Sequence, residues 1–140
     1  QWEGKAKITK AFQDLSAVID SAGLCIFFAV RNLAGKTLDV PPDGIMEYLN
    51  AATGLEYTLK ELMLAGERII TAERQFLVRA GMSRKDDSLP KRLTHEPMPS
   101  GPAEGKVCHL EEMLEEYYQA QDWTPDGVPT EERLASLGLT

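Results

Sequence analysis

A long amphipathic segment of this chain ends in the stretch Asp20-Ser21-Ala22-Gly23-Leu24-Cys25, and the apolar run Ile26-Phe27-Phe28-Ala29-Val30 follows it. Gly23 allows a helix to stop and the chain to turn there, because glycine adopts left-handed backbone angles without a steric cost. The thiol of Cys25 is then carried on a turn between apolar residues. Such a cysteine is usually a small buried hydrophobe, but a turn can also present it as a ligand. The residues alone leave both alternatives open.

The length and composition are those of an ordinary globular protein. The chain has 140 residues, of which 43% are hydrophobic and 26% charged, and we expect a single helical domain over 1–140. The formal net charge of -7 argues against nucleic acid or an anionic membrane as a partner. No apolar run is long enough to span a bilayer. The 2 cysteines are too few for a disulfide framework, and no signal peptide is recognisable, so we expect a cytoplasmic location.

Hydrophobic periodicity predicts helices in the first half of the chain. A first helix is expected over 5–21, with Asp14 on its solvent face and an apolar stripe at helical spacing made by Ile8, Ala11, Phe12, Leu15, Val18 and Ile19. The segment 24–31 is either a short helix or a buried loop. A second helix should begin at the prolines 41–42 and end at Gly54.

The longest helix is expected to follow a capping box and to end at Gly81. Thr58 and Glu61 have the spacing at which each side chain satisfies the other's amide group. The apolar stripe of this helix consists of Leu59, Leu62, Met63, Gly66, Ile69, Ile70, Phe76 and Leu77. Glycine inside a helix costs about 1 kcal/mol, so Gly66 on this stripe indicates a close helix crossing.

The second half of the chain is less regular. Prolines keep 82–106 extended, and such a long irregular segment usually wraps over a surface or serves a site. A helix with an acidic solvent face is expected over 110–118, and a last short helix begins near Pro129 and ends at Gly138. The predicted fold class is therefore all-α, an irregular multi-helical bundle with a long Pro-rich irregular segment.

The polar residues of the chain do not by themselves form a recognisable site. His95, Cys108 and His109 lack the paired spacing of a zinc site, so we interpret Cys108 as a filler and His109 as lying near the start of a helix. Cys25 has no base nearby in sequence that would activate it as a nucleophile, and no catalytic residue is assigned. The pair Asp86-Asp87 is interpreted as a salt-bridged turn rather than a cation site. We expect Tyr117, Tyr118 and Trp123 to be core residues.

Three stretches together resemble the C-terminal region of the aldehyde:ferredoxin oxidoreductase family. The first is 12–25, which contains an Asp-x-x-Gly-Leu-Cys motif ending at Cys25. The second is 79–90, an arginine-glycine segment followed by Asp-Asp-x-Leu-Pro. The third runs from Met113 through Tyr117-Tyr118, Trp123 and Pro129 to Leu139. Their order and spacing fit the family over almost the whole chain.

The resemblance implies roles for four residues. Asp20 would hydrogen-bond a pterin, and Gly23 and Leu24 would pack against it. Cys25 would be the fourth ligand, and the only metal ligand in this chain, of a 4Fe-4S cluster that passes electrons to ferredoxin. The family's enzymes carry tungsten or molybdenum on a bis-pterin and oxidise aldehydes to carboxylic acids in the cytoplasm of anaerobes.

The resemblance also implies that the chain is a fragment of a larger oxidoreductase. The other three cluster cysteines and the remaining pterin contacts lie upstream in the family, so we expect the fragment alone to be inactive and to hold no cofactor. Its partners would be the upstream domains, ferredoxin and the aldehyde substrate. Two alternatives remain: the same domain in an aromatic acyl-CoA reductase subunit, and a cofactor-free helical interaction module. An apolar patch over 24–28 is expected to be exposed and to favour self-association.

Overall fold

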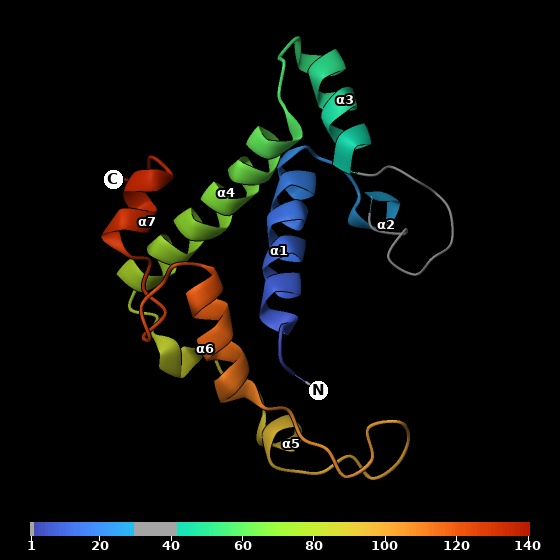
Figure 1. Cartoon of the computed structure of the whole chain (residues 1–140), viewed down its shortest axis with the longest axis vertical. Helices are drawn as coiled ribbons and strands as arrows, with labels where there is room; N and C mark the ends of the chain where they lie inside the picture. The colour runs from blue at the N-terminus through green and yellow to red at the C-terminus, as the bar shows by residue number, and fades with distance from the viewer. Residues whose placement is uncertain (1, 30–41) are drawn as a thin grey trace. The chain divides into compact units, whose positions relative to one another are not determined.

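The computed structural model describes residues 2–29 and 42–140, and these residues are helical or irregular (Figure 1). The helices are α1 (Lys5–Ser21), α2 (Ile26–Ala29), α3 (Pro42–Thr53), α4 (Leu59–Arg79), α5 (Lys91–Thr94), α6 (Leu110–Ala120) and α7 (Glu131–Ser136), and a 3-10 helix, η2, covers Arg84–Asp86. No strand occurs within the described ranges; one isolated bridge pairs Trp123 with Pro129. The predicted all-α class is confirmed, as are the limits of the first helix.

The chain divides into two compact units. Unit 1 consists of Gln1–Lys10 and Arg74–Arg133, and unit 2 consists of Ala11–Glu73 and Leu134–Thr140. The single domain over 1–140 stays a prediction. None of the helices in the described ranges combines the length and the apolarity that a membrane span requires.

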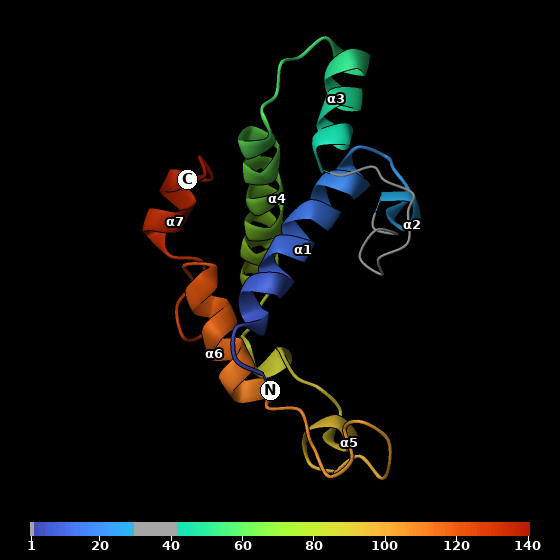
Figure 2. The same ribbon diagram turned by 45° about the vertical axis from the view of Figure 1, so that its right-hand side comes forward.

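The core of unit 2 lies where α1, α3 and α4 meet. Its buried side chains come from all three helices, namely Val18, Ile19, Ile45 and Leu62. Partly buried residues packed against them are Leu15, Leu24, Met46 and Leu49. Figure 2 shows the start of α3 next to the C-terminal end of α1. The capping box before α4 is confirmed, since the Thr58 amide donates to Glu61 Oε2 at 2.8 Å and the Glu61 amide to Thr58 Oγ1 at 3.3 Å.

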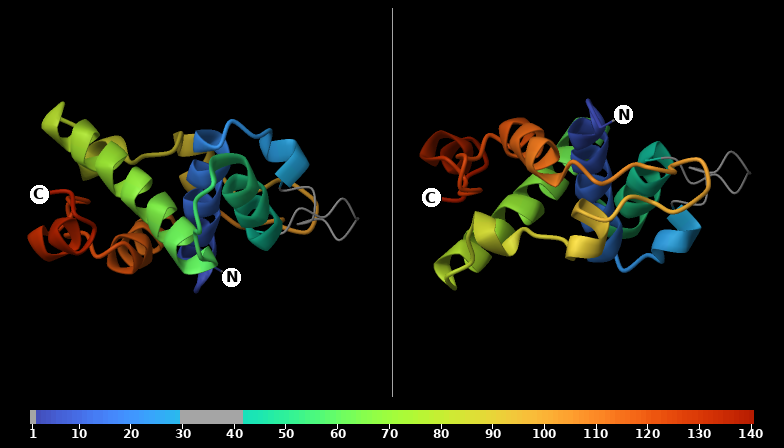
Figure 3. Two further views of the ribbon diagram at one scale, coloured as in Figure 1. Left: turned by 90° about the horizontal axis from the view of Figure 1, so that it is seen from above. Right: turned by 90° about the horizontal axis from the view of Figure 1, so that it is seen from below.

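α1 and α4 cross at Gly66, as the sequence predicts. A Cβ built on Gly66 would overlap the carbonyl oxygen of Asp14 and lie 2.8 Å from its carbonyl carbon. Both views in Figure 3 show α4 crossing α1. The expectation that Asp14 faces solvent is wrong: it is 3% exposed, because the backbone of α4 at Gly66 lies against it.

The apolar stripes extend further in sequence than the packing does. Ile8 in α1 is 59% exposed, and Phe76 and Leu77 in α4 are 71% and 41% exposed. Periodicity identifies which residues share a helix face, but it does not show how far a neighbouring element covers that face. These three side chains therefore belong to the predicted apolar stripes without being buried.

We expect Gly66→Ala to destabilise the chain by about 1–3 kcal/mol, because the new methyl group overlaps the Asp14 carbonyl and this crowding outweighs the gain in helix propensity. Urea denaturation measures the free energy of unfolding. Leucine has a helix propensity similar to that of alanine but a larger side chain, so Gly66→Leu should destabilise the chain more than Gly66→Ala does. An increase in stability in both variants would contradict the close crossing.

Unit 1 contains the irregular segment. After α4, the chain forms η2, passes Pro90, makes the single turn of α5 and returns through 95–109 to α6 (Figure 1). The sequence predicts an extended chain here and does not predict α5. Proline lacks a backbone N–H group, and the start of a helix does not use that group in a hydrogen bond within the helix. Pro90 can therefore directly precede the helix Lys91–Thr94.

Candidate functional site

The predicted site residues lie on the turn that ends α1. Gly23 has φ +70°, its amide donates to the Asp20 carbonyl at 3.0 Å, and the Leu24 amide donates to the Ile19 carbonyl at 3.1 Å. This pair of hydrogen bonds is a Schellman motif, and the packing of Leu24 on the core that contains Ile19 completes it. The main chain and one apolar contact therefore fix the turn.

The two functional groups of the turn both face outward. Asp20 is exposed, and Cys25 is an exposed free cysteine immediately before α2. Leu24, expected to contact the pterin, is half-buried and also serves as the anchor of the turn. Local structure thus presents a carboxylate and a thiol on either side of Gly23, and it does not bury the thiol as a core residue.

The apolar residues after the turn are also exposed. Ile26 is 37% and Phe27 82% exposed, which agrees with the expected patch, whereas Leu24 packs on the core of unit 2. The side chain of Phe28 lies outside the described part. Self-association through this patch stays a prediction.

The turn is suited to supply one metal ligand. The thiol of Cys25 is accessible, and a Cβ built on Gly23 would meet nothing within 4 Å, so the backbone of the turn is open to a bulky neighbour. Over residues 2–29 and 42–140, no group of three or more His, Cys, Asp or Glu residues is placed to hold a metal ion. These residues fit a cluster ligand and a pterin contact only if other ligands come from another part of a longer protein.

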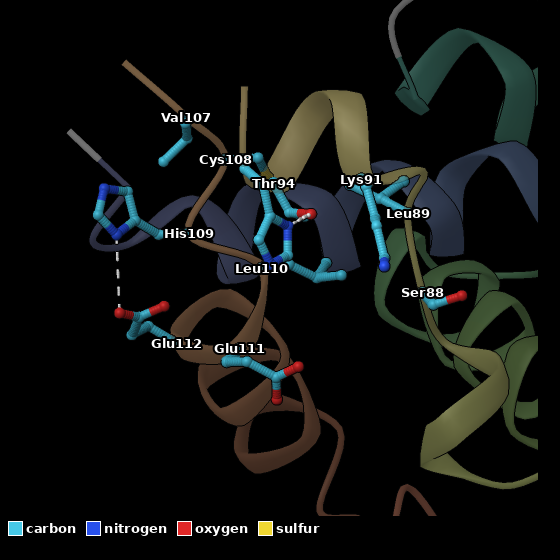
Figure 4. Close-up of a pocket in the computed structure, with 11 residues that line it drawn as sticks. Ser88, Leu89, Lys91, Thr94, Val107, Cys108, His109, Leu110, Glu111 and Glu112 are labelled. Carbon is cyan, nitrogen blue, oxygen red and sulfur yellow. Dashed lines mark hydrogen bonds and ion pairs between the residues drawn. The ribbon is translucent and has the colours of Figure 1, made fainter. Parts of the chain in front are cut away.

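The second cysteine belongs to a different region, in unit 1. Cys108 is half-buried, its amide donates to the Leu93 carbonyl at 2.8 Å, and it lines a cavity of about 400 Å³ between α5 and the start of α6 (Figure 4). His109 occupies the N-cap of α6, and its Nδ1 lies 3.6 Å from Glu112 Oε1. His95 Nδ1 lies 2.7 Å from Thr94 Oγ1. The side chains of His95 and His109 thus have partners within unit 1, and the interpretation of Cys108 as a filler stays a prediction.

A buried charged cluster holds unit 1 together. Arg74 makes a two-pronged ion pair with Asp87, with Nη1 2.9 Å from Oδ1 and Nη2 2.6 Å from Oδ2, and its Nε donates to the Gly127 carbonyl at 2.7 Å. Tyr118 donates to Asp87 Oδ2 at 2.5 Å. The guanidinium carbon lies 5.3 Å from the centre of the Trp123 ring. The cluster joins the end of α4, the turn after η2, α6 and the loop before α7.

The cluster corrects one interpretation and confirms two. Asp87 does form a salt-bridged turn, but its partner is Arg74, thirteen positions away, and not a neighbouring basic residue. Tyr118 and Trp123 are 2% and 7% exposed, as expected of core residues. The sequence contains one signal of this packing, Gly127: it has φ +72°, and a Cβ there would overlap Arg74 and lie 2.9 Å from the Tyr118 ring.

Burial and hydrogen bonding shift two pKa values in the cluster. Burial raises the pKa of Asp87, but hydrogen bonds from Arg74 and Tyr118 outweigh it, so this pKa lies below its ordinary value. Burial and the hydrogen bond to Asp87 raise the pKa of Tyr118 to about 12. Both shifts favour the ionised carboxylate and the neutral phenol, the pair that makes the observed hydrogen bond.

We expect Tyr118→Phe to lower the free energy of unfolding by about 2 kcal/mol at pH 8, because a hydrogen bond to a charged group is lost. The raised pKa of Tyr118 stabilises the folded state fully below about pH 10, and this contribution disappears as the pH rises towards 12. The difference between the wild-type chain and the variant should therefore shrink between pH 8 and pH 11. Urea denaturation at both pH values measures it, and a constant difference would contradict the assigned hydrogen bond.

Comparison with known families gives one match that spans the chain. A family model described as "Aldehyde ferredoxin oxidoreductase, domains 2 & 3" matches residues 1–139. A tungsten-containing aldehyde ferredoxin oxidoreductase from Pyrococcus abyssi is 46% identical over 136 residues, which is 96% of this chain and 21% of that protein. The chain therefore spans about a fifth of the length of this relative.

Two further similarities are to proteins with other names. The WOR-like subunit of an aliphatic sulfonate oxidoreductase from Pyrococcus furiosus is 33% identical over 134 residues, covering 89% of this chain and 20% of that subunit. Among solved structures, the active site complex BamBC of benzoyl coenzyme A reductase, bound to 1,5-dienoyl-CoA, superposes with a TM-score of 0.74 at 25% identity. This superposition covers 96% of this chain and 19% of that one.

Proposed function

The chain belongs to the aldehyde ferredoxin oxidoreductase family, and we propose that it is the C-terminal, cofactor-contacting part of a tungsten-pterin, iron–sulfur oxidoreductase. The proposed enzyme oxidises aldehydes to carboxylic acids and uses ferredoxin as electron acceptor. The observation that carries this proposal is the turn at Gly23, which holds Asp20 and Cys25 outward on a backbone fixed by hydrogen bonds.

Each exposed group of the turn has a separate proposed role. The carboxylate of Asp20 accepts the paired N–H donors of a pterin, for which two carboxylate oxygens are well suited. The thiolate of Cys25 supplies one ligand to a 4Fe-4S cluster, whose other ligands come from upstream in the polypeptide. When bound, the cluster would relay electrons between the tungsten site and ferredoxin. Gly23 and Leu24 keep the turn in place while leaving its outer side open.

Sequence identity favours an aldehyde as the substrate over the alternatives. The chain is 46% identical to the aldehyde enzyme, but 33% identical to the sulfonate enzyme and 25% to the benzoyl-CoA reductase component. By this measure the aromatic acyl-CoA reductase, the enzyme alternative that the sequence left open, ranks below both. The exposure of Cys25 and the family membership both argue against a cofactor-free interaction module. A cytoplasmic location in an anaerobe accompanies the proposal.

The proposal is tested on the full-length enzyme, purified without oxygen. We expect tungsten, iron and acid-labile sulfide in the protein, and aldehyde-dependent reduction of ferredoxin that neither a sulfonate nor an aromatic acyl-CoA can replace. Tungsten with turnover of a sulfonate or an acyl-CoA alone would refute the aldehyde assignment. A protein without tungsten or iron would refute the cofactor-contacting role.

A further inference from the structure

One segment of unit 1 has a defined backbone but almost no buried side chain. Every residue of 88–106 is exposed except Thr94, which is half-buried. Its large apolar side chains Leu89, Leu93 and Met98 are 39%, 47% and 48% exposed. Single exposed apolar residues are common, but a segment of this length in a compact protein normally buries some of its side chains.

Hydrogen bonds and prolines, rather than a hydrophobic core, define the path of this segment. The Met98 amide donates to the Lys106 carbonyl at 3.0 Å, the Gly105 amide to the Met98 carbonyl at 2.9 Å and the Leu93 amide to the Pro90 carbonyl at 2.8 Å. The prolines at 90, 97, 99 and 102 restrict the backbone further. A segment ordered before it binds loses less conformational entropy on binding, so this arrangement suits a docking element.

The N-terminal end of the described chain lies beside this segment. Trp2 and Lys5 line a cavity of about 580 Å³ together with Ala103, Gly105 and Lys106. The ring of Trp2 also stacks on His109, with the ring centres 6.3 Å apart. Under the proposed function, the preceding part of the polypeptide joins the chain at this end, next to 88–106, and covalent attachment gives it a high effective concentration there.

We propose that residues 88–106 form a docking arm that packs against the upstream part of the same polypeptide and buries Leu89, Leu93 and Met98. The proposal rests on the proposed function, because it requires a longer protein. In the P. abyssi relative, about four fifths of the length lies outside the matched region. We assign the partner of the arm to the same polypeptide, because the residues that precede Trp2 in the longer protein would join the chain beside the arm.

Photochemical cross-linking in the full-length enzyme tests the proposal. The photoreactive residue p-benzoylphenylalanine replaces Met98, and the cross-linked peptides are identified by mass spectrometry on a mixture of ¹⁴N- and ¹⁵N-labelled enzyme. We expect cross-links to peptides that precede Trp2 in the same isotopic copy. Cross-links between isotopic copies would show that a second molecule occupies the arm. Cross-links within 1–140, or none, would also overturn the proposal.

A control position and a second readout guard against an artefact of the substitution. Glu131, exposed at the start of α7, carries the same probe; an equal yield of upstream cross-links there would overturn the proposal, because labelling would not depend on position. In the unsubstituted enzyme, peroxide should oxidise Met98 at least about tenfold more slowly than in the urea-unfolded enzyme, since burial protects the thioether. Equal rates would overturn it.

The same preparations separate this inference from the proposed function. Tungsten, iron and aldehyde-dependent ferredoxin reduction are measured on the enzyme that is cross-linked. An enzyme with these properties and no upstream cross-link would refute the docking arm alone. An enzyme with upstream cross-links but without tungsten and iron would refute the proposed function alone.

Discussion

The Cys25→Ala variant of the full-length enzyme should reduce ferredoxin at least about 100-fold more slowly than the wild type. Changes to residues that only support metal ligands commonly cost 10–100-fold in affinity or activity, and loss of a ligand itself should exceed that range. The thiol of Cys25 is exposed on a fixed turn, so its removal leaves the fold of α1 and its Schellman motif intact. The rate of ferredoxin reduction with saturating aldehyde measures the effect.

Cys108→Ala is the matched control for this experiment. Cys108 is half-buried in unit 1, where its amide bonds to the Leu93 carbonyl, and the backbone amide is unchanged by the substitution. This variant should keep the iron content and the ferredoxin-dependent rate of the wild type. Equal losses in the two variants would mean that cysteine removal acts through general damage, and an unaffected Cys25→Ala variant would refute the ligand assignment.

Asp87→Ala should lower the free energy of unfolding by about 3–5 kcal/mol, because it leaves the charge of a buried arginine without a partner. Arg74 has a side chain that is 7% exposed, and the ion pair with Asp87 neutralises it. Because the pKa of Asp87 is lowered in the folded state, its stabilising contribution is present at neutral pH. It is lost as the pH falls through that lowered value. Urea denaturation at pH 7 measures the loss.

The adjacent carboxylate provides the control for Asp87. Asp86 is exposed and accepts a hydrogen bond from the Ser83 amide at 2.8 Å, so Asp86→Ala should cost about 1 kcal/mol, the typical value of a helix cap. The double variant Arg74→Met, Asp87→Leu should recover part of the loss, because it removes both charges of the ion pair. Equal costs for Asp86→Ala and Asp87→Ala would contradict the buried ion pair.

The sequence was sufficient for the elements whose signals are local. The end of α1 at Gly23, the capping box at Thr58 and the glycine at the α1–α4 crossing each depend on residues a few positions apart or on one side-chain size. The all-α class follows from the same helical periodicity. These predictions needed no knowledge of the tertiary contacts.

Features that depend on distant partners could not be predicted in the same way. The burial of Asp14 follows from the position of α4, and Phe76 is exposed because no side chain of the described residues covers it. Arg74 pairs with Asp87 and with the carbonyl of Gly127, which is 53 positions away. No local pattern encodes these pairings. The outward orientation of Cys25 is compatible with a ligand, but the other ligands of the proposed cluster would have to come from outside this chain.

The most direct test of the central claim is a magnetic resonance measurement on the side-chain atom of residue 25 that is proposed to bind the cluster. The full-length enzyme is prepared with ⁷⁷Se-selenocysteine in place of Cys25, its cluster is reduced, and electron paramagnetic resonance and electron–nuclear double resonance spectra are recorded. The account predicts ⁷⁷Se hyperfine coupling to the cluster spin from position 25, and none when the label replaces Cys108. An iron–sulfur signal without ⁷⁷Se coupling from position 25 would contradict it.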